Sequence, residues 1–240
     1  MARLLEKIKK RVANHADWWK DYMTEMSILV ISLAATFYGE SLIQNYQEAQ
    51  EDHQTMEMVV DELEYNQETL ETLVKQYTME QQFAVVLDHA LIGHETFPED
   101  TLEKYTDFHY DIYYSLWKHN AFDLIKLSGT MQRIDDKTLS LRLFECYEWL
   151  GVIKEMDVNF REERKSRRAE FISHLEGGAH AKNTAEQWKQ IDANEAFKHY
   201  LLYSMPSTAR TIYGNVREAR EIVSETIRMI RETYHISKDK

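Results

Sequence analysis

The chain has 240 residues, of which only 7 are glycine and 2 are proline, and its formal net charge is −12. A chain this acidic is a poor candidate for nucleic-acid binding, because the binding surface must neutralise phosphates with Lys and Arg. Long stretches are rich in Glu, Gln, Leu, Lys and Ala and little material suits turns, so the sequence predicts an all-α fold. The single cysteine, Cys146, excludes an internal disulfide and a multi-cysteine zinc site.

The first predicted element is a short basic amphipathic helix over residues 1–17. Apolar residues recur there at helical spacing, namely Leu4, Leu5, Ile8 and Val12. Six Lys or Arg stand against two acidic residues before position 21, whereas Gln44 to Asp100 holds fourteen acidic residues and one base, Lys75. A basic head therefore precedes the next element, and an acidic segment follows it.

An apolar stretch, EMSILVISLAATFYGE, comes next and places fourteen uncharged residues between Glu25 and Glu40. Fourteen helical residues span about 21 Å, which is short of a roughly 30 Å hydrocarbon core. Uncharged residues extend the stretch on both sides, and aromatic residues flank it as they do at membrane interfaces. We expect a transmembrane helix over residues 18–46. Its predicted interfacial anchors are Trp18, Trp19, Tyr22, Phe37, Tyr38 and Tyr46.

The charge asymmetry predicts the orientation of this helix, because Lys and Arg near a span favour the cytoplasmic side. The N-terminus would be cytoplasmic, and residues 47–240 would form a helical domain outside the cytoplasm. The alternative is a soluble protein in which the apolar stretch is a buried helix, since stretches this short are often core.

One face of the apolar stretch combines small and polar residues. Its members are Glu25, Ser32, Ala35, Thr36, Gly39 and Glu40. Small residues permit close approach of helices, so this face is predicted to be a helix–helix interface in the membrane. Two alternatives stay open: the glutamates line a polar path for ions or protons, or they lie at the rim and reach water.

A long amphipathic helix follows without a proline for more than fifty residues. Apolar residues recur in it at spacings of three and four. They are Met56, Val59, Val60, Leu63, Leu70, Leu73, Val74 and Tyr77. The helix can be continuous with the apolar stretch, with a break near Gly39 or Gly93.

A structural αα-hairpin is predicted after the turn signal at Pro98. A periodic run from Thr101 ends at Ser128-Gly129, where glycine suits a helix stop, and Asp135 or Asp136 can cap the next helix. The hairpin is expected to bury Phe122, Leu124, Ile125, Ile134, Leu139, Leu143 and Phe144. Further helices are expected to end at Gly177-Gly178, to begin at Asn183 or Thr184, and to restart at Pro206.

Candidate chemistry is sparse. His89 and His94, or Asp107, His109 and Asp111, do not have the spacing of a helical di-metal site, and nucleotide-binding and nucleophile-elbow motifs do not occur. We therefore expect no catalytic residue, no cofactor and no metal. The basic cluster from Arg161 to Arg168 is predicted to be a solvated face that pairs with acids on the long helix, and Cys146 a buried apolar group.

Several blocks of the chain resemble an uncharacterised bacterial domain-of-unknown-function family of small membrane-anchored helical proteins. One block matches at Phe122, Ile125, Ser128, Gly129, Ile134, Leu139, Leu143 and Tyr147. Others are Gln44-Asn45-Tyr46, where the family often has Trp in place of Tyr46, the element Glu62-Leu63-x-x-Asn66, and the last helix over residues 213–230. The resemblance implies a single-span protein of the bacterial inner membrane whose bulk is periplasmic. It implies no activity.

These observations favour a non-enzymatic membrane-anchored scaffold or accessory subunit, with membrane lipid and either a second copy or a membrane-protein complex as partners. One alternative is a subunit associated with ion or proton transport that uses Glu25 and Glu40. Another is a soluble helical interaction module.

Overall fold

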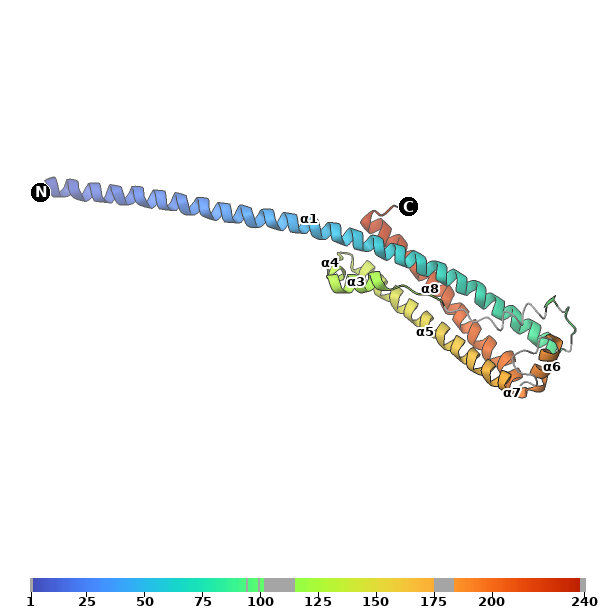
Figure 1. Cartoon of the computed structure of the whole chain (residues 1–240). Coiled ribbons are helices and arrows are strands. Elements are labelled where there is room, and N and C mark those ends of the chain that lie inside the picture. The colour runs from blue at the N-terminus through green and yellow to red at the C-terminus, as the bar shows by residue number, and fades with distance from the viewer. Residues whose placement is uncertain (1, 94, 99, 102–114, 175–183, 238–240) are drawn as a thin grey trace. The chain divides into compact units, whose positions relative to one another are not determined.

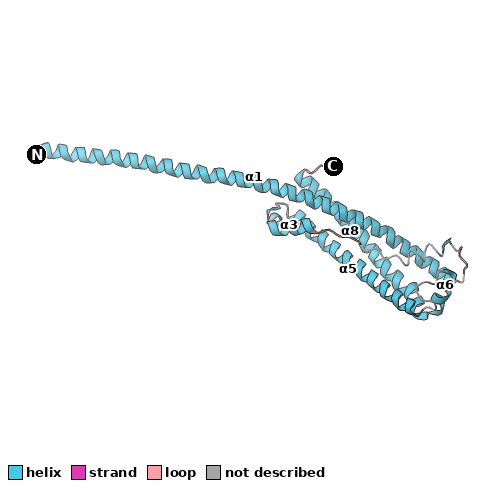
Figure 2. Ribbon diagram, viewed as in Figure 1, coloured by secondary structure: helices cyan, strands magenta, loops and turns pink. Residues whose placement is uncertain are grey.

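The computed structural model describes residues 2–93, 95–98, 100–101, 115–174 and 184–237, and of residues 2–18, 20, 21 and 184–188 it describes the backbone alone. Every regular element in these ranges is a helix (Figure 2), so the all-α prediction is confirmed. The chain divides into two compact units, Met1–Gln54, called unit 1, and Thr55–Lys240, called unit 2.

Helix α1 runs from Ala2 to Leu91, and its first part forms unit 1 (Figure 1). No break occurs at Gly39, where a Cβ atom would meet no neighbour within 4 Å. The helix ends close to the other predicted position: the amide of Gly93 donates to the carbonyl of Asp88 over 3.2 Å, and a Cβ at Gly93 would lie 2.8 Å from the carbonyl oxygen of His89. Glycine is favoured there because a Cβ atom at this distance would overlap the backbone oxygen.

Unit 2 has its core along the C-terminal part of α1. Six of the apolar residues predicted from the three- and four-residue spacing are at most 1 % exposed, namely Met56, Val59, Leu63, Leu70, Leu73 and Tyr77. Val60 is 2 % exposed, and Val74 packs at the edge of the core. A single stripe of the helix is thus covered, as expected for an amphipathic helix in a bundle.

Two further long helices cover that stripe: α5, Lys137–Ser173, and α8, Met205–Tyr234 (Figure 1). Helices α1 and α5 run parallel, because Glu62 contacts Tyr147 and Gln76 contacts Arg161, and both pairs are 85 residues apart. Helix α8 runs antiparallel to α5: Arg142 contacts Glu225, whereas Met156, later in α5, contacts the earlier Asn215. Unit 2 is therefore built around a three-helix bundle.

Parallel packing of α1 and α5 requires the chain to return along the bundle between them. Residues 102–114 of the predicted periodic run lie outside the described residues, and residues 115–119 are not helical. Helix α3 begins only at Asn120 and ends at Ser128, and α4 is the single turn Thr130–Arg133. The prediction of a helix from Thr101 was thus wrong for residues 115–119, which we call the return segment. Asn66 of α1 holds this segment by hydrogen bonds to the backbone of Lys118.

The turn between α3 and α5 matches the local sequence signals. Gly129 has φ 77°, the left-handed conformation that glycine adopts at low cost. The side chain of Asp136 accepts hydrogen bonds from the amides of Thr138 and Leu139 and so caps α5. The buried positions are Phe122, Ile125, Ile134, Leu139 and Leu143. Leu124 is 39 % and Phe144 is 47 % exposed, so their predicted burial was wrong.

The last helices are joined differently from the prediction. Helix α6, Thr184–Ala193, is followed by Asn194, whose side chain accepts from the amide of Phe197 and caps α7, Glu195–His199. A π-helical turn, η2, Tyr200–Ser204, then leads directly into α8. Pro206 lies in the first turn of α8, so the predicted start of the last helix at this proline is confirmed, but a π-helical turn and not a break in the helix precedes it. The preceding π-turn offers the irregular backbone in which a residue without an N–H is tolerated.

Candidate functional site

The apolar segment of α1 is the first candidate site. Its side chains are exposed around the whole helix: Leu29 is 56 %, Ile31 67 % and Phe37 67 % exposed. The part of this helix from Tyr22 to Leu91 contains an 18-residue window that is apolar enough to cross a membrane, and none of that window is buried. A surface helix of a soluble bundle would instead show an apolar stripe and a polar face.

Two hydroxyl groups within the segment, those of Ser27 and Thr36, are satisfied by the helix itself. Ser27 Oγ donates to the carbonyl of Met23 over 2.7 Å, and Thr36 Oγ1 donates to the carbonyl of Ser32 over 2.9 Å. Such bonds remove the need for water as a partner. At these two positions the polar groups therefore meet the demand that hydrocarbon places on them.

The predicted helix–helix face lies within this exposed segment. Gly39 is partly exposed, and the other members are exposed, namely Glu25, Ser32, Ala35, Thr36 and Glu40. No other part of unit 1 covers this face, because the unit consists of a single helix over its described residues. Both close helix packing and contact with lipid are compatible with this arrangement.

The predicted interfacial aromatics are exposed where their side chains are described. Trp19 is 54 % and Tyr22 is 44 % exposed, and their rings meet edge to face at 6.1 Å. At the other flank the exposed aromatics are Phe37, Tyr38 and Tyr46. The side chain of Trp18 lies outside the described residues. Amphipathic rings in these positions suit the headgroup layer.

A second cluster of interest holds the return segment of unit 2 against α1. Asn66 donates from Nδ2 to the carbonyl of Lys118 over 2.8 Å and accepts from the amide of Lys118 over 3.0 Å. Glu62 accepts from the amide of Ala121 over 2.9 Å and from Tyr147 Oη over 2.7 Å. We call Glu62 and Asn66 the α1 latch.

The α1 latch supplies the cap that helix α3 lacks locally. His119, at the N-cap position, makes no side-chain hydrogen bond to the first turn of α3. The carboxylate of Glu62 binds the free amides of that turn, where the helix dipole favours negative charge. The carboxylate also raises the pKa of Tyr147, in addition to a larger contribution from burial. Glu62 and Asn66 belong to the Glu62-Leu63-x-x-Asn66 element, which is part of the resemblance described above.

A buried charge cluster joins α1 to α5 further along the bundle. Tyr77 Oη donates to Asp157 Oδ1 over 2.9 Å, Arg161 Nε donates to the same carboxylate over 2.9 Å, and Arg161 also donates to Gln76 Oε1 over 2.7 Å. The side chain of Asp157 is 1 % exposed. Burial and the neighbouring carboxylate raise the pKa of Tyr77, so its hydroxyl stays protonated as a donor.

The neighbouring pair Glu80 and Arg164 completes this cluster. Their side chains are only 4 % and 5 % exposed, and the guanidinium donates to Glu80 Oε1. Burial raises the pKa of Glu80, and the positive charges of Arg164 and Arg161 oppose that shift. The prediction of a solvated face was therefore wrong for Arg161 and Arg164. The predicted pairing with an acid of the long helix is confirmed by Glu80.

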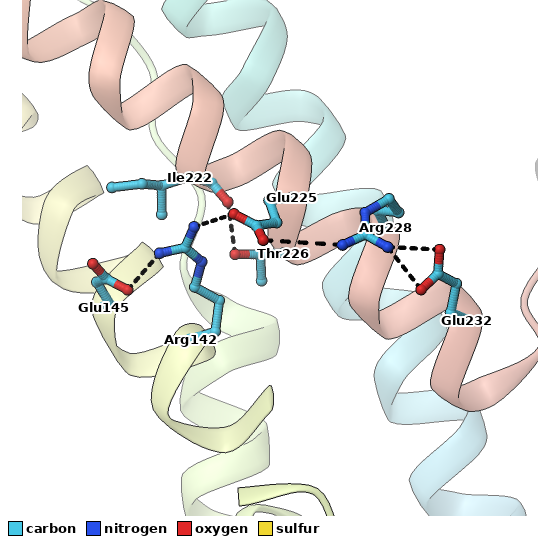
Figure 3. Close-up of polar contacts among 7 residues, drawn as sticks. All are labelled: Arg142, Glu145, Ile222, Glu225, Thr226, Arg228 and Glu232. Carbon is cyan, nitrogen blue, oxygen red and sulfur yellow. Dashed lines mark hydrogen bonds and ion pairs between the residues drawn. The ribbon is translucent and has the colours of Figure 1, made fainter. Parts of the chain in front are cut away.

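A shallow groove of about 620 Å³ separates the N-terminal part of α5 from the C-terminal part of α8. Figure 3 shows that Arg142 of α5 contacts Glu145 of the same helix and Glu225 of α8, while Arg228 contacts Glu225 and Glu232. Both arginines of this groove are thus paired with carboxylates of the groove. The contacts drawn link α5 with α8. With Asp136 the lining holds four carboxylates against two arginines, so no cationic surplus is available to bind an anionic substrate.

Other candidate groups from the sequence have structural surroundings. Cys146 is fully buried, and burial raises the pKa of its thiol to about 12, so it is a packing group without thiolate character. His89 Nδ1 lies 3.3 Å from Glu95 Oε2 at the exposed end of α1. Within the described ranges no group of three or more potential metal ligands gathers. His94, Asp107, His109 and Asp111 lie outside those ranges.

Comparison of the chain with protein-family models, with curated proteins and with solved structures gives no match. The resemblance to a family of membrane-anchored proteins therefore stays a prediction. A functional conclusion has to come from the geometry of the apolar segment and of the bundle.

Proposed function

We propose that the protein is a single-span membrane anchor that presents a helical scaffold on the non-cytoplasmic side. Residues 1–17 form the cytoplasmic head, residues 18–46 the span, and residues 47–240 the domain outside the cytoplasm. One observation carries this proposal: the apolar residues of α1 from Tyr22 to Tyr46 are exposed on all sides, whereas from Met56 to Leu91 most apolar residues are buried, and the buried ones lie along one stripe.

The cost of leaving the segment in water supports the proposal. Contiguous exposed apolar surface of this kind is rare in soluble monomers and marks a membrane or protein interface. The segment is helical throughout, so its backbone hydrogen bonds are internal, as a span requires. Its flanking aromatics and the basic head supply the anchor and the orientation.

The proposed role as a scaffold or accessory subunit draws on how the bundle uses its charged groups. The α1 latch and the buried charge cluster bind α1 to α5 and to the return segment through pairs 52 to 85 residues apart. Buried polar networks of this kind can specify one arrangement of helices. A bundle held rigidly in this way suits the presentation of a surface to a partner.

Membrane fractionation tests the proposal directly. We expect the full chain to remain in the membrane pellet after extraction at alkaline pH and to enter solution only with detergent. Reporter fusions should place the N-terminus in the cytoplasm and the C-terminus outside it. Recovery of the chain in the soluble fraction without detergent would overturn the anchor and favour the soluble interaction module.

A second measurement addresses the scaffold role. The mass of the detergent-solubilised protein and the identity of proteins that co-purify with it should reveal an oligomer or a complex. Gly39→Leu should weaken an assembly that uses the small-residue face, because a larger side chain prevents close approach. Ion or proton flux through the wild type that Glu25→Gln with Glu40→Gln abolishes would instead favour the transport-associated role.

A further inference from the structure

An apolar stripe with a strict seven-residue repeat runs through the N-terminal part of α1. The positions 5, 8, 12, 15, 19, 22, 26, 29 and 33 alternate by three and four, and they hold Leu, Ile, Val, His, Trp, Tyr, Met, Leu and Leu. Ten charged residues lie between positions 2 and 33, and none of them falls on this stripe. A repeat of 3.5 residues is the spacing of a coiled-coil seam.

The structure leaves this stripe uncovered where its side chains are described. Trp19 is 54 %, Tyr22 44 %, Met26 42 % and Leu29 56 % exposed. Unit 1 contains no second helix among its described residues that could cover them. The partner of the stripe must therefore come from outside this part of the chain.

Helix continuity decides between a lipid surface and another helix as that partner. Helix α1 is uninterrupted from Ala2, and neither proline nor glycine precedes Gly39. Sharp kinks occur almost always at such residues or at helix defects. If residues 18–46 span a membrane, a straight helix carries the head away from the lipid surface, and its apolar positions then face water.

We propose that residues 5–33 form a parallel two-stranded coiled coil with the same residues of a second copy of this chain. The proposal rests on the proposed single span for the part of the stripe that lies in lipid. Parallel orientation follows from the shared topology, since both copies insert with their basic heads on the same side.

Charge placement is compatible with pairing of two basic heads. In a parallel coiled coil, the residue just before seam position 5, 12, 19 or 26 contacts the residue five positions later in the partner helix. The resulting pairs are Leu4 with Lys9, Arg11 with Ala16, Trp18 with Met23, and Glu25 with Val30. None of these pairs brings like charges together, and the remaining bases stand on the outer faces.

Disulfide cross-linking in native membranes tests the proposal. The stripe variants are Leu5→Cys, Ile8→Cys and Val12→Cys, and the matched off-stripe controls are Lys10→Cys and Asn14→Cys. The native thiol of Cys146 is fully buried, so the wild type serves as the blank. We expect about ten-fold more disulfide-linked dimer at stripe positions than at the controls, because only seam positions bring Cβ atoms within bonding distance.

Equal cross-linking at all five positions would overturn the proposal, because it would report random collision. Absence of dimer combined with protection of the stripe thiols from a water-soluble maleimide would overturn it in favour of a head that lies on lipid. Fractionation of the same samples separates the two proposals. If a variant forms the dimer but is recovered in the soluble fraction, the proposed membrane anchor is refuted and the coiled coil is not. If a variant stays in the membrane pellet but forms no dimer, the coiled coil is refuted and the anchor is not.

Discussion

Two parts of one helix use apolar residues in opposite ways. In unit 1, residues between Tyr22 and Tyr46 expose Leu, Ile and Phe side chains around the whole helix. In unit 2, the same helix confines its buried apolar residues from Met56 to Leu91 to one stripe, and that stripe is covered by α5 and α8. A helix with one apolar stripe is stabilised by packing against partner helices. A helix with apolar residues around its whole circumference is instead typical of a membrane environment.

The two parts also differ in how polar groups are treated. Ser27 and Thr36 in unit 1 bond to carbonyls of their own helix. Glu62, Asn66 and Glu80 in unit 2 reach side chains and backbone more than fifty residues away. Polar groups that bond within their own helix are compatible with a lipid environment. Hydrogen bonds to distant residues instead hold unit 2 in one arrangement of helices.

The largest effect is expected from a substitution that disrupts the buried charge cluster between α1 and α5. Asp157→Ala removes the acceptor of Tyr77 and leaves the buried guanidinium of Arg161 without its ion-pair partner, so we expect the free energy of unfolding to fall by roughly 3–5 kcal/mol. Urea denaturation of the detergent-solubilised protein measures this change. Glu162→Ala, at an exposed position of the same helix, is the control and should change the value by less than about 0.5 kcal/mol.

Two leucines of α1 compare the buried stripe of unit 2 with the exposed apolar segment of unit 1. Leu70 is fully buried and Leu29 is 56 % exposed. Leu70→Ala should lower the unfolding free energy of the bundle by roughly 2–5 kcal/mol, because it leaves a cavity in the core. Leu29→Ala should leave it unchanged. Equal losses in the two variants, measured by the same denaturation, would mean that the exposed segment is packed in the native protein.

A charge placed in the middle of the apolar segment tests whether this segment lies in a membrane. Leu33→Arg should weaken membrane insertion by about 2.5–3.5 kcal/mol, the cost of arginine at the centre of a span. The pellet fraction after alkaline extraction reports the effect. Leu127→Arg, at a position 86 % exposed in unit 2, should leave the pellet fraction unaltered. Unchanged insertion of the Leu33 variant would argue that this segment does not span.

The pH dependence of stability tests the buried charge cluster. Burial raises the pKa of Glu80 above its usual value, so the folded state binds the proton more tightly than the unfolded state. The contribution of Glu80 to stability is therefore largest at low pH and falls as pH rises from the unfolded pKa through the folded one. Relative to Glu80→Gln, the wild type should lose unfolding free energy over that window. A difference that stays constant with pH would contradict the raised pKa.

Features that depend on local spacing could be predicted from the sequence. The covered stripe of α1 followed from its period, and Gly129 and Asp136 followed from turn and cap chemistry. The exposed apolar segment followed from its composition. Each of these signals lies within a few residues of the feature that it predicts.

Features that depend on distant pairing could not be predicted in this way. The burial of Arg164 follows from Glu80, 84 residues away. Glu62 caps α3 from a position 59 residues before Ala121, and the non-helical run before Asn120 exists because Asn66 holds it. The start of α8 at Pro206 agreed with the local rule, but the π-helical turn that joins α7 to α8 was not predicted. No local pattern carries these relations.

The smallest expected effect compares two glycines with opposite surroundings. Gly129 has φ 77° and ends α3, whereas Gly39 lies in a regular helix where an added methyl group would meet no atom within 4 Å. Gly129→Ala should cost roughly 1–2 kcal/mol, because an L side chain is strained in the left-handed region. Gly39→Ala should not lower the thermal midpoint of the far-UV circular dichroism, since alanine favours helix by about 1 kcal/mol over glycine. A loss of dimer in Gly39→Ala without a loss of helix would show that the glycine serves contact between helices, and that the exposed apolar segment of unit 1 is covered in the membrane by another chain.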